Sequence, residues 1–178
     1  MLEQAGFHNG TAFREVVREH QRGVYAFALH LTGNHHDAED LSQDVFIQAH
    51  RTLASFRGDG SLRSWLLRIT VNTFVSGRRK KSLTMVQPRD LFDHEVASDQ
   101  AGPEQDAQAT AIRLEVERAL EDLSPQERAA FALRFHSDLP VREVAEAMGV
   151  ADGTVKSLLF RAVQKLRRQL GHLVADLT

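Results

Sequence analysis

The feature that most constrains the fold is a pair of helix-forming stretches joined by a glycine near the C-terminal end. Pro140 suits the start of the first stretch, because the N–H that proline lacks would be unpaired there anyway. Apolar residues then recur at helical spacing as far as Met148, and Gly149 suits the left-handed residue that ends a helix. Asp152 suits the cap of the second stretch. The pattern predicts a helix-turn-helix, a layout typical of DNA readers.

The second stretch has a basic face. Polar side chains must lie opposite its predicted apolar stripe, which consists of Val155, Leu159, Ala162, Leu166, Leu170 and Leu173. Residues 154–170 contain five Lys or Arg and no Asp or Glu, which matches the phosphate-neutralising pattern of DNA binding. A solvated basic surface is the alternative, but the coincidence of cap, turn and preceding helix favours DNA contact. The outward side chains are predicted to include Ser157, Arg161, Gln164 and Arg168.

Composition narrows the class of protein. The chain has 178 residues, of which 42% are hydrophobic and 26% charged, as in ordinary soluble proteins. It contains no cysteine, which excludes disulfides and thiolate zinc sites. No apolar run approaches the roughly 18 residues of a membrane span, and the N-terminus lacks a signal-peptide pattern. We expect a cytoplasmic protein without membrane insertion.

The net charge of −2 conceals an uneven distribution. Residues 63–81 contain six cations and no acids, whereas residues 82–108 contain one cation and six acids. Two basic surfaces separated by an acidic connector are therefore expected.

Apolar periodicity predicts an all-α fold with two small domains joined by a flexible acidic linker, the second domain containing the helix-turn-helix. The first domain, 8–81, is predicted to hold helices over 11–32, over about 37–55, and from a Ser61 cap to near Gly77. The linker is predicted over 82–106, where periodicity is lost. The second domain is predicted over 107–173.

Two details of these helices can be tested. The third helix is expected to carry a stripe through Leu62, Trp65, Leu66, Ile69 and Thr73, with Trp65 and Ile69 in the core. A fourth helix is expected to carry a stripe through Ile112 and Val116. The sequence Ser124-Pro125-Gln126-Glu127 then combines an N-cap, a proline at N1 and a capping-box glutamate, so it predicts a fifth helix.

An acidic stretch, 37–46, forms a second constellation. Acids in a first helical turn are favoured by the helix dipole, which explains Asp37 and its neighbours. The helix dipole does not explain why Gln43 and Asp44 stand beside Phe46, which is expected to be exposed. This mixture of polar and aromatic side chains suits a protein-binding face.

A metal-dependent phosphohydrolase is a remote alternative for the same stretch, because histidines and aspartates crowd together there. Such a site needs further ligands from other helices, and no spacing singles out His30 or His50. We expect no metal, no cofactor and no catalytic site. The four crowded residues are His35, His36, Asp37 and Asp40.

Five stretches, in order, resemble extracytoplasmic-function sigma factors of RNA polymerase. They are the run Asp37 to Phe46, then Phe56-Arg57-Gly58-Asp59, then Ser64 to Ile69 with Asn72, then Leu123 to Arg128, and finally Gly153-Thr154-Val155-Lys156-Ser157 with Phe160-Arg161-Ala162.

The resemblance implies a bacterial initiation factor, with promoter DNA and core RNA polymerase as partners. The polymerase contacts would be the clamp of the beta-prime subunit and the flap of the beta subunit, and an anti-sigma factor would regulate the chain. The clamp would meet Asp40, Leu41, Gln43, Asp44 and Phe46.

The resemblance also assigns DNA contacts. Phe56 and Asn72 would receive a base flipped from the minus-ten element. Nearby phosphates would meet Arg78, Arg79, Lys80 and Lys81. The minus-thirty-five element would meet Thr154, Lys156, Ser157, Phe160, Arg161, Gln164 and Arg168.

Two positions depart from the family pattern. Leu158 stands where an arginine is usual, which implies the loss of one DNA contact, and Ser76 stands where an acid or amide is frequent. A conventional helix-turn-helix regulator is the alternative function, in which the first domain would be a sensor or a dimerisation module. Tight binding of the free chain to one operator would favour the regulator.

Overall fold

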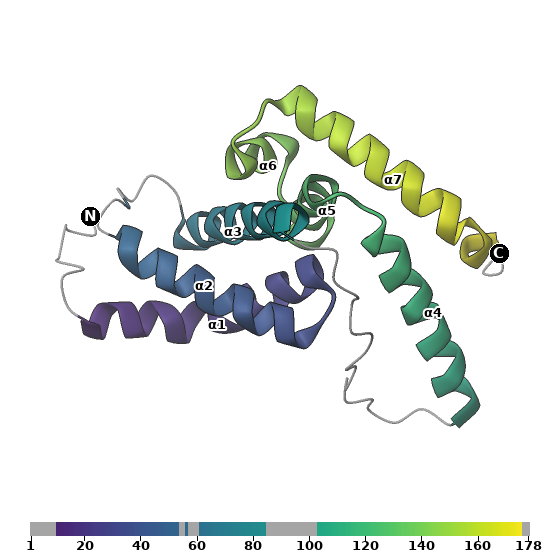
Figure 1. Cartoon of the computed structure of the whole chain (residues 1–178), viewed down its shortest axis with the longest axis horizontal. Coiled ribbons are helices and arrows are strands. Elements are labelled where there is room, and N and C mark those ends of the chain that lie inside the picture. Colours follow the sequence, from purple (N-terminus) through teal and green to yellow (C-terminus); the bar gives the residue numbers. More distant parts are fainter. Residues whose placement is uncertain (1–9, 54–55, 57–60, 85–102, 176–178) are drawn as a thin grey trace. The chain divides into compact units, whose positions relative to one another are not determined.

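The computed structural model describes residues 10–53, 56, 61–84 and 103–175 (Figure 1). The chain divides into two compact units, Met1–Met85 and Val86–Thr178. Every regular element in the described ranges is helical, so the predicted all-α class is confirmed. No described helix combines the length and the apolar character needed to cross a bilayer.

In the part of the first unit that the structure describes there are three helices, each of which contacts the other two. They are α1 (Gly10–Thr32), α2 (His35–Thr52) and α3 (Leu62–Thr84). Gly33 joins α1 to α2 with φ of +83°, a conformation that glycine adopts without steric cost. Asn34 then caps α2, because its side chain accepts a hydrogen bond of 2.8 Å from the backbone N–H of Asp37. The second helix therefore begins two residues before its predicted start at 37.

The core of the first unit differs from the expected stripe on α3. Among the described side chains of α3, those buried are Leu66, Leu67, Thr70, Val71 and Phe74, and of these only Leu66 belongs to the expected stripe. The prediction that Trp65 and Ile69 are core residues is wrong, because both are only half-buried. The face of α3 that carries them is therefore partly open.

The described residues of the second unit form four α-helices and one π-helical turn. They are α4 (Pro103–Glu121), α5 (Pro125–Phe131), the π turn η2 (Ala132–His136), α6 (Val141–Met148) and α7 (Asp152–Ala175). The predicted capping box at α5 is confirmed, since Ser124 and Glu127 each accept a hydrogen bond from the other's backbone N–H. The π turn was not predicted. Ile112, expected on the buried stripe of α4, is 41% exposed.

The predicted helix-turn-helix is present as α6, a turn and α7. Gly149 ends α6 with φ of +66°, and its N–H donates to carbonyls of the last turn. The carbonyl of Ala151 accepts the first hydrogen bonds of α7, from Thr154 and Val155. Ala151 is therefore the N-cap, and Asp152 is the first helical residue, where its charge favours the helix dipole.

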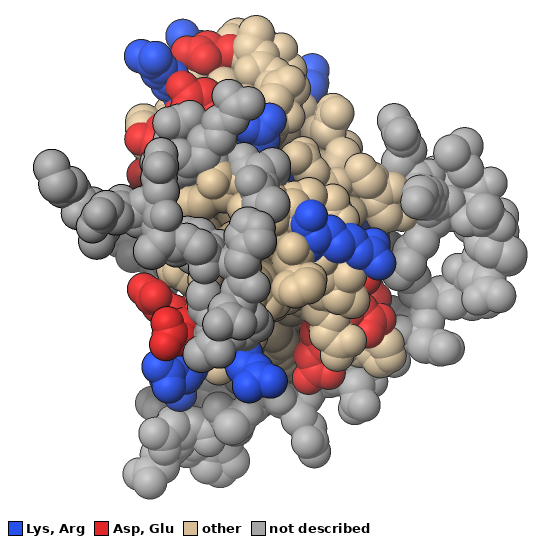
Figure 2. All heavy atoms as spheres, turned by 90° about the vertical axis from the view of Figure 1, so that its left-hand side faces the viewer, with Lys and Arg blue, Asp and Glu red and all other residues tan. Residues whose placement is uncertain are grey.

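The helices reach further than the predicted linker allows. The last turn of α3 extends through Thr84, and α4 begins at Pro103; the intervening residues 85–102 lie outside the described ranges. Figure 2 shows described Lys and Arg side chains beside Asp and Glu in some places and among uncharged residues in others.

Candidate nucleic-acid and protein interfaces

One face of α7 is buried and the other is open to solvent. Val155, Leu158 and Ala162 are at most 2% exposed, and their spacing places them on one side of the helix. All seven side chains predicted to meet the minus-thirty-five element are exposed: Thr154, Lys156, Ser157, Phe160, Arg161, Gln164 and Arg168.

Phe160 is the most exposed large hydrophobic side chain among the described residues, at 66%. It follows Ser157 by three positions, so both lie on the same side of α7. An exposed phenylalanine is not needed for packing within the unit, and it is a group that contacts the methyl group of thymine in a major groove.

Leu158, one of the two departures from the family pattern, is buried, whereas Leu159 is only half-buried although the predicted stripe included it. The side chain of Leu158 is 2% exposed and belongs to the core, since it follows the buried Val155 by three residues. The leucine side chain itself therefore takes no part in the open face of α7. Leucine here contributes buried apolar surface instead.

A buried glutamate connects α5 to α7. Glu127 is 4% exposed. Its Oε1 accepts a hydrogen bond of 3.2 Å from Nε of Arg161, and its Oε2 accepts one of 2.7 Å from Nζ of Lys165. Oε2 also accepts the backbone N–H of Ser124 at 2.9 Å. Both oxygens of the buried carboxylate therefore accept hydrogen bonds.

These partners determine the ionisation of Glu127. Burial is the largest single influence and by itself would raise the pKa of the carboxyl group. The hydrogen bond and the charge of Lys165, with the hydrogen bonds at Ser124, outweigh burial and leave the pKa of Glu127 below its ordinary value. The group is therefore ionised at neutral pH.

Lys165 is one of the five cations that suggested a phosphate-binding helix. Besides its bond to Glu127, its ammonium donates to the carbonyl oxygen of Asp122 at 3.2 Å. Lys165 thus joins α7 to the start of α5, a role that the sequence pattern did not reveal. The one-turn spacing of Arg161 and Lys165 is compatible with a shared acidic partner, but that partner, Glu127, stands 34 residues before Arg161.

The outer face of α2 carries most of the predicted polymerase contacts. Asp40, Gln43 and Asp44 are exposed, and Phe46, which was expected to be exposed, is half-buried. Leu41 is 7% exposed and belongs to the core, so its side chain offers almost no surface to a partner. Ile47, which the sequence pattern did not single out, is 50% exposed and lies on the same face as Asp40 and Asp44.

The predicted base pocket is only partly assembled in this structure. Phe56 packs on Trp65, with ring centroids 5.3 Å apart. Asn72 is exposed and lies seven positions after Trp65, which is roughly 10 Å along the helix axis. Phe56 and Asn72 thus mark the two ends of an open strip on α3.

The basic cluster follows this strip along α3. The guanidinium of Arg78 lies over the ring of Phe74, 5.6 Å from its centroid. Ser76 is exposed on the same helix. The side chains of Arg79, Lys80 and Lys81 lie outside the described part of the structure.

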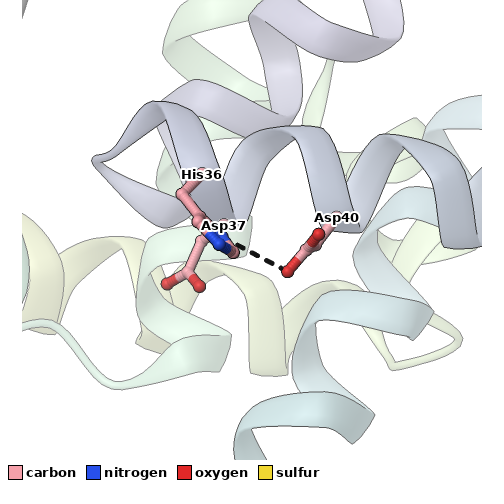
Figure 3. A group of neighbouring side chains, drawn as sticks. All are labelled: His36, Asp37 and Asp40. Carbon is pink, nitrogen blue, oxygen red and sulfur yellow. Dashed lines mark ion pairs between the residues drawn. The ribbon is translucent and has the colours of Figure 1, made fainter.

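The metal hypothesis rests on three neighbouring side chains of α2, drawn in Figure 3. His36 and Asp40 pair at 3.4 Å and are 86% and 64% exposed, while Asp37 accepts a hydrogen bond from Asn34. His35, expected to join them, is hydrogen-bonded to Tyr25 at 2.5 Å. His50 packs edge-on against Phe13. The described side chains thus lack the convergence from several helices that the hypothesis needs.

Two family models match the chain, "Sigma-70 region 2" over residues 16–84 and "Sigma-70, region 4" over residues 113–166. The ECF RNA polymerase sigma factor SigM of Mycobacterium tuberculosis is 37% identical over 91% of this chain and 79% of its own length. The chain belongs to the ECF RNA polymerase sigma factors.

Further comparisons agree with this assignment. The ECF sigma factor SigE of Mycolicibacterium smegmatis is 37% identical over 88% of this chain, which spans 60% of that relative's length. The sigma factor RpoE of Bartonella quintana, solved with the anti-sigma factor NepR, is 28% identical with a TM-score of 0.65, over 89% of this chain and 96% of that one.

Membership of the family explains both units of the molecule. The region 2 match covers most of α1, all of α2 and all of α3, which a conventional helix-turn-helix regulator would not require. The region 4 match begins within α4 and ends within α7. The chain is therefore an alternative sigma factor, and the regulator and phosphohydrolase hypotheses are set aside.

Proposed function

We propose that this sigma factor directs core RNA polymerase to a specific set of promoters, with its first unit opening the minus-ten element and its second unit reading the minus-thirty-five element. The observation that carries the proposal is the open face of α7, where all seven predicted contact residues are exposed opposite a buried stripe. A helix of this kind fits the major groove, and its hydrogen-bonding and cationic side chains suit base edges and phosphates.

The outer face of α2 binds the clamp of the beta-prime subunit. Asp40, Gln43 and Asp44 supply charge and hydrogen-bonding groups, and the half-buried Phe46 and the exposed Ile47 supply apolar surface. A mixture of charged and apolar side chains is typical of protein interfaces. The second unit binds the flap of the beta subunit, as the family resemblance implies.

The open strip on α3 receives a base of the opened minus-ten element. An unstacked base regains part of its lost stacking energy on an aromatic side chain, and Phe56 with Trp65 provides such a surface. The amide of Asn72 can bond a base edge. The cations from Arg78 to Lys81 hold the neighbouring phosphates.

An anti-sigma protein keeps the factor inactive until a signal releases it. The support is the likeness to the Bartonella quintana sigma factor, which was solved with its anti-sigma factor. The factor has no catalytic role of its own, because the polymerase forms the phosphodiester bonds.

Reconstitution tests this function. Core RNA polymerase with the purified chain is expected to start RNA at defined positions in a genomic fragment library, and the mapped starts should share two sequence elements. Core alone is the control. The free chain should bind an isolated promoter duplex poorly. Absence of defined start sites would refute the proposal, and tight operator binding by the free chain would restore the regulator hypothesis.

A further inference from the structure

The bonds from Glu127 engage two of the five cations of α7, and one of these, Arg161, belongs to the proposed DNA-reading face. We infer that Glu127 is a positioning residue for promoter recognition: it fixes the orientation of Arg161 and withholds Lys165 from the DNA backbone. The inference rests on the proposed function of α7 and deepens it. It assigns part of the promoter specificity to a buried side chain on α5.

The geometry at Arg161 supports orientation. Nε donates to Oε1 of Glu127 at 3.2 Å, and the arginine side chain is 57% exposed. Because a guanidinium is planar, a bond at Nε restricts the plane of the group. Its two terminal nitrogens retain four N–H donors for a base edge or a phosphate. An arginine held in this way enters the groove already ordered, which lowers the entropic cost of binding.

The geometry at Lys165 supports withholding. Its ammonium donates to Oε2 of Glu127 at 2.7 Å and to the carbonyl oxygen of Asp122 at 3.2 Å, so two of its three donors are engaged. The lysine side chain is 35% exposed. Lys165 therefore adds a positive charge to the sequence of α7 without adding a phosphate contact.

This division bears on specificity. Each phosphate that a protein neutralises steepens the fall of log affinity with log salt by about 0.9. Phosphate contacts strengthen binding to every sequence, whereas an oriented arginine distinguishes bases. A carboxylate that keeps one cation away from phosphates and orients another raises the ratio of specific to non-specific binding.

The variant Glu127→Gln separates these roles from simple stability. Glutamine retains an oxygen that can accept the Ser124 N–H, so the capping box can form, but it removes the charge that binds Arg161 and Lys165. Glu115→Gln is the matched control, since Glu115 also pairs with a side chain of α7, His172, at 2.9 Å. Both variants change the net charge equally.

Two measurements are expected to distinguish the variants. With holoenzyme and a random-sequence duplex, Glu127→Gln should steepen the salt dependence by about one phosphate contact. With holoenzyme, its discrimination between a mapped promoter and the same promoter with a scrambled minus-thirty-five element should fall about tenfold. Glu115→Gln should match the unchanged chain in both.

A double variant identifies the cation that is released. Lys165→Gln alone should leave the salt dependence unchanged, because Lys165 does not reach phosphate in the unchanged protein. In the Glu127→Gln background it should restore the original salt dependence. If Glu127→Gln behaves like Glu115→Gln, or if Lys165→Gln alone flattens the salt dependence, the inference is overturned. If unchanged holoenzyme fails to distinguish the two promoters, the proposed function fails. The salt dependence of the variants then still decides whether Glu127 withholds Lys165 from phosphate.

Discussion

Single residues in this sigma factor join elements that are distant in the sequence. Glu127 closes the capping box of α5 and also binds two side chains of α7, so one carboxylate stabilises a helix start and a helix–helix contact. A buried acid is stabilising only when its partners offset the loss of hydration. Here the partners are a backbone N–H, a guanidinium and an ammonium.

The lowered pKa of Glu127 predicts how stability depends on pH. A carboxyl group whose pKa is lower in the folded state contributes stability that is fully present above its unfolded value, about 4.3 for glutamate. That contribution is lost as the pH falls through the folded pKa. The difference in free energy of unfolding between the unchanged chain and Glu127→Gln should therefore be constant from pH 7 to 5 and shrink below about pH 4. Urea unfolding at each pH measures it; a constant difference down to pH 3 would contradict the assignment.

Asp138 provides a second prediction, because it is the one described non-glycine residue with positive φ, at 54°. The left-handed region is strained for a residue with a Cβ atom, even for aspartate, which tolerates it better than most. Asp138→Gly should remove the strain and raise the free energy of unfolding by about 0.5–1 kcal/mol, after the entropy that glycine adds to the unfolded chain. Asp138→Ala keeps a Cβ atom and should give no such gain in denaturant unfolding. Equal effects of the two variants would refute the strain.

At the scale of elements, local signals predicted the helix ends better than the helix faces. Ser124, Gly149 and Ser61 act within a few residues of the backbone groups that they satisfy, so the sequence alone reveals them. The buried face of α3 could not be predicted in this way. Apolar side chains such as Trp65, Leu67, Ile69 and Val71 surround that helix, so periodicity does not select one side, and packing against α1 and α2 decides.

Two glycines, one within α1 and one directly after it, make a matched test of how backbone conformation affects stability. Gly23 lies within α1, and a Cβ atom added there would meet nothing within 4 Å, whereas Gly33 has φ of +83° between α1 and α2. Gly23→Ala should raise the free energy of unfolding by about 0.5–1 kcal/mol, because alanine loses less entropy in a helix. Gly33→Ala should lower it, since alanine is strained at that φ. Thermal and denaturant unfolding of both variants check the opposite signs; a loss of stability in Gly23→Ala would contradict the open space around it.

At the scale of the whole molecule, helical spacing in the sequence predicted exposed faces on α2 and α7. It did not predict the hydrogen bonds from Arg161 and Lys165 to Glu127. The exposed residues of α2 and α7 follow from helical spacing within one element. The bond between Glu127 and Arg161 spans 34 positions, and no local pattern reports such a contact. The proposed polymerase-binding face on α2 and the proposed base-binding strip on α3 are separate surfaces of the first unit, so the two proposed roles can be disturbed independently.

A pair of variants in the first unit tests that independence. Asp44→Lys reverses a charge on the exposed face of α2 and should weaken core binding about tenfold, because an interface charge is replaced by its opposite. Glu19→Lys makes the same change at an exposed position of α1, outside the proposed interface, and should have little effect. Fluorescence titration of core with labelled chain measures both, and equal losses would remove Asp44 from the interface.

Asn72→Ala should have the complementary effect. It removes an exposed amide from α3, so holoenzyme should form normally while the fraction of promoter opened falls about tenfold through the lost hydrogen bond to the flipped base. Permanganate reactivity of unpaired thymines measures opening, and the same titration measures core binding. A promoter opened artificially by mismatches at the minus-ten element should reduce the deficit, because the cost of unpairing is then already met. Equal loss of core binding and opening would show instead that Asn72 supports the fold of the unit, and the base pocket on α3 would have to be abandoned.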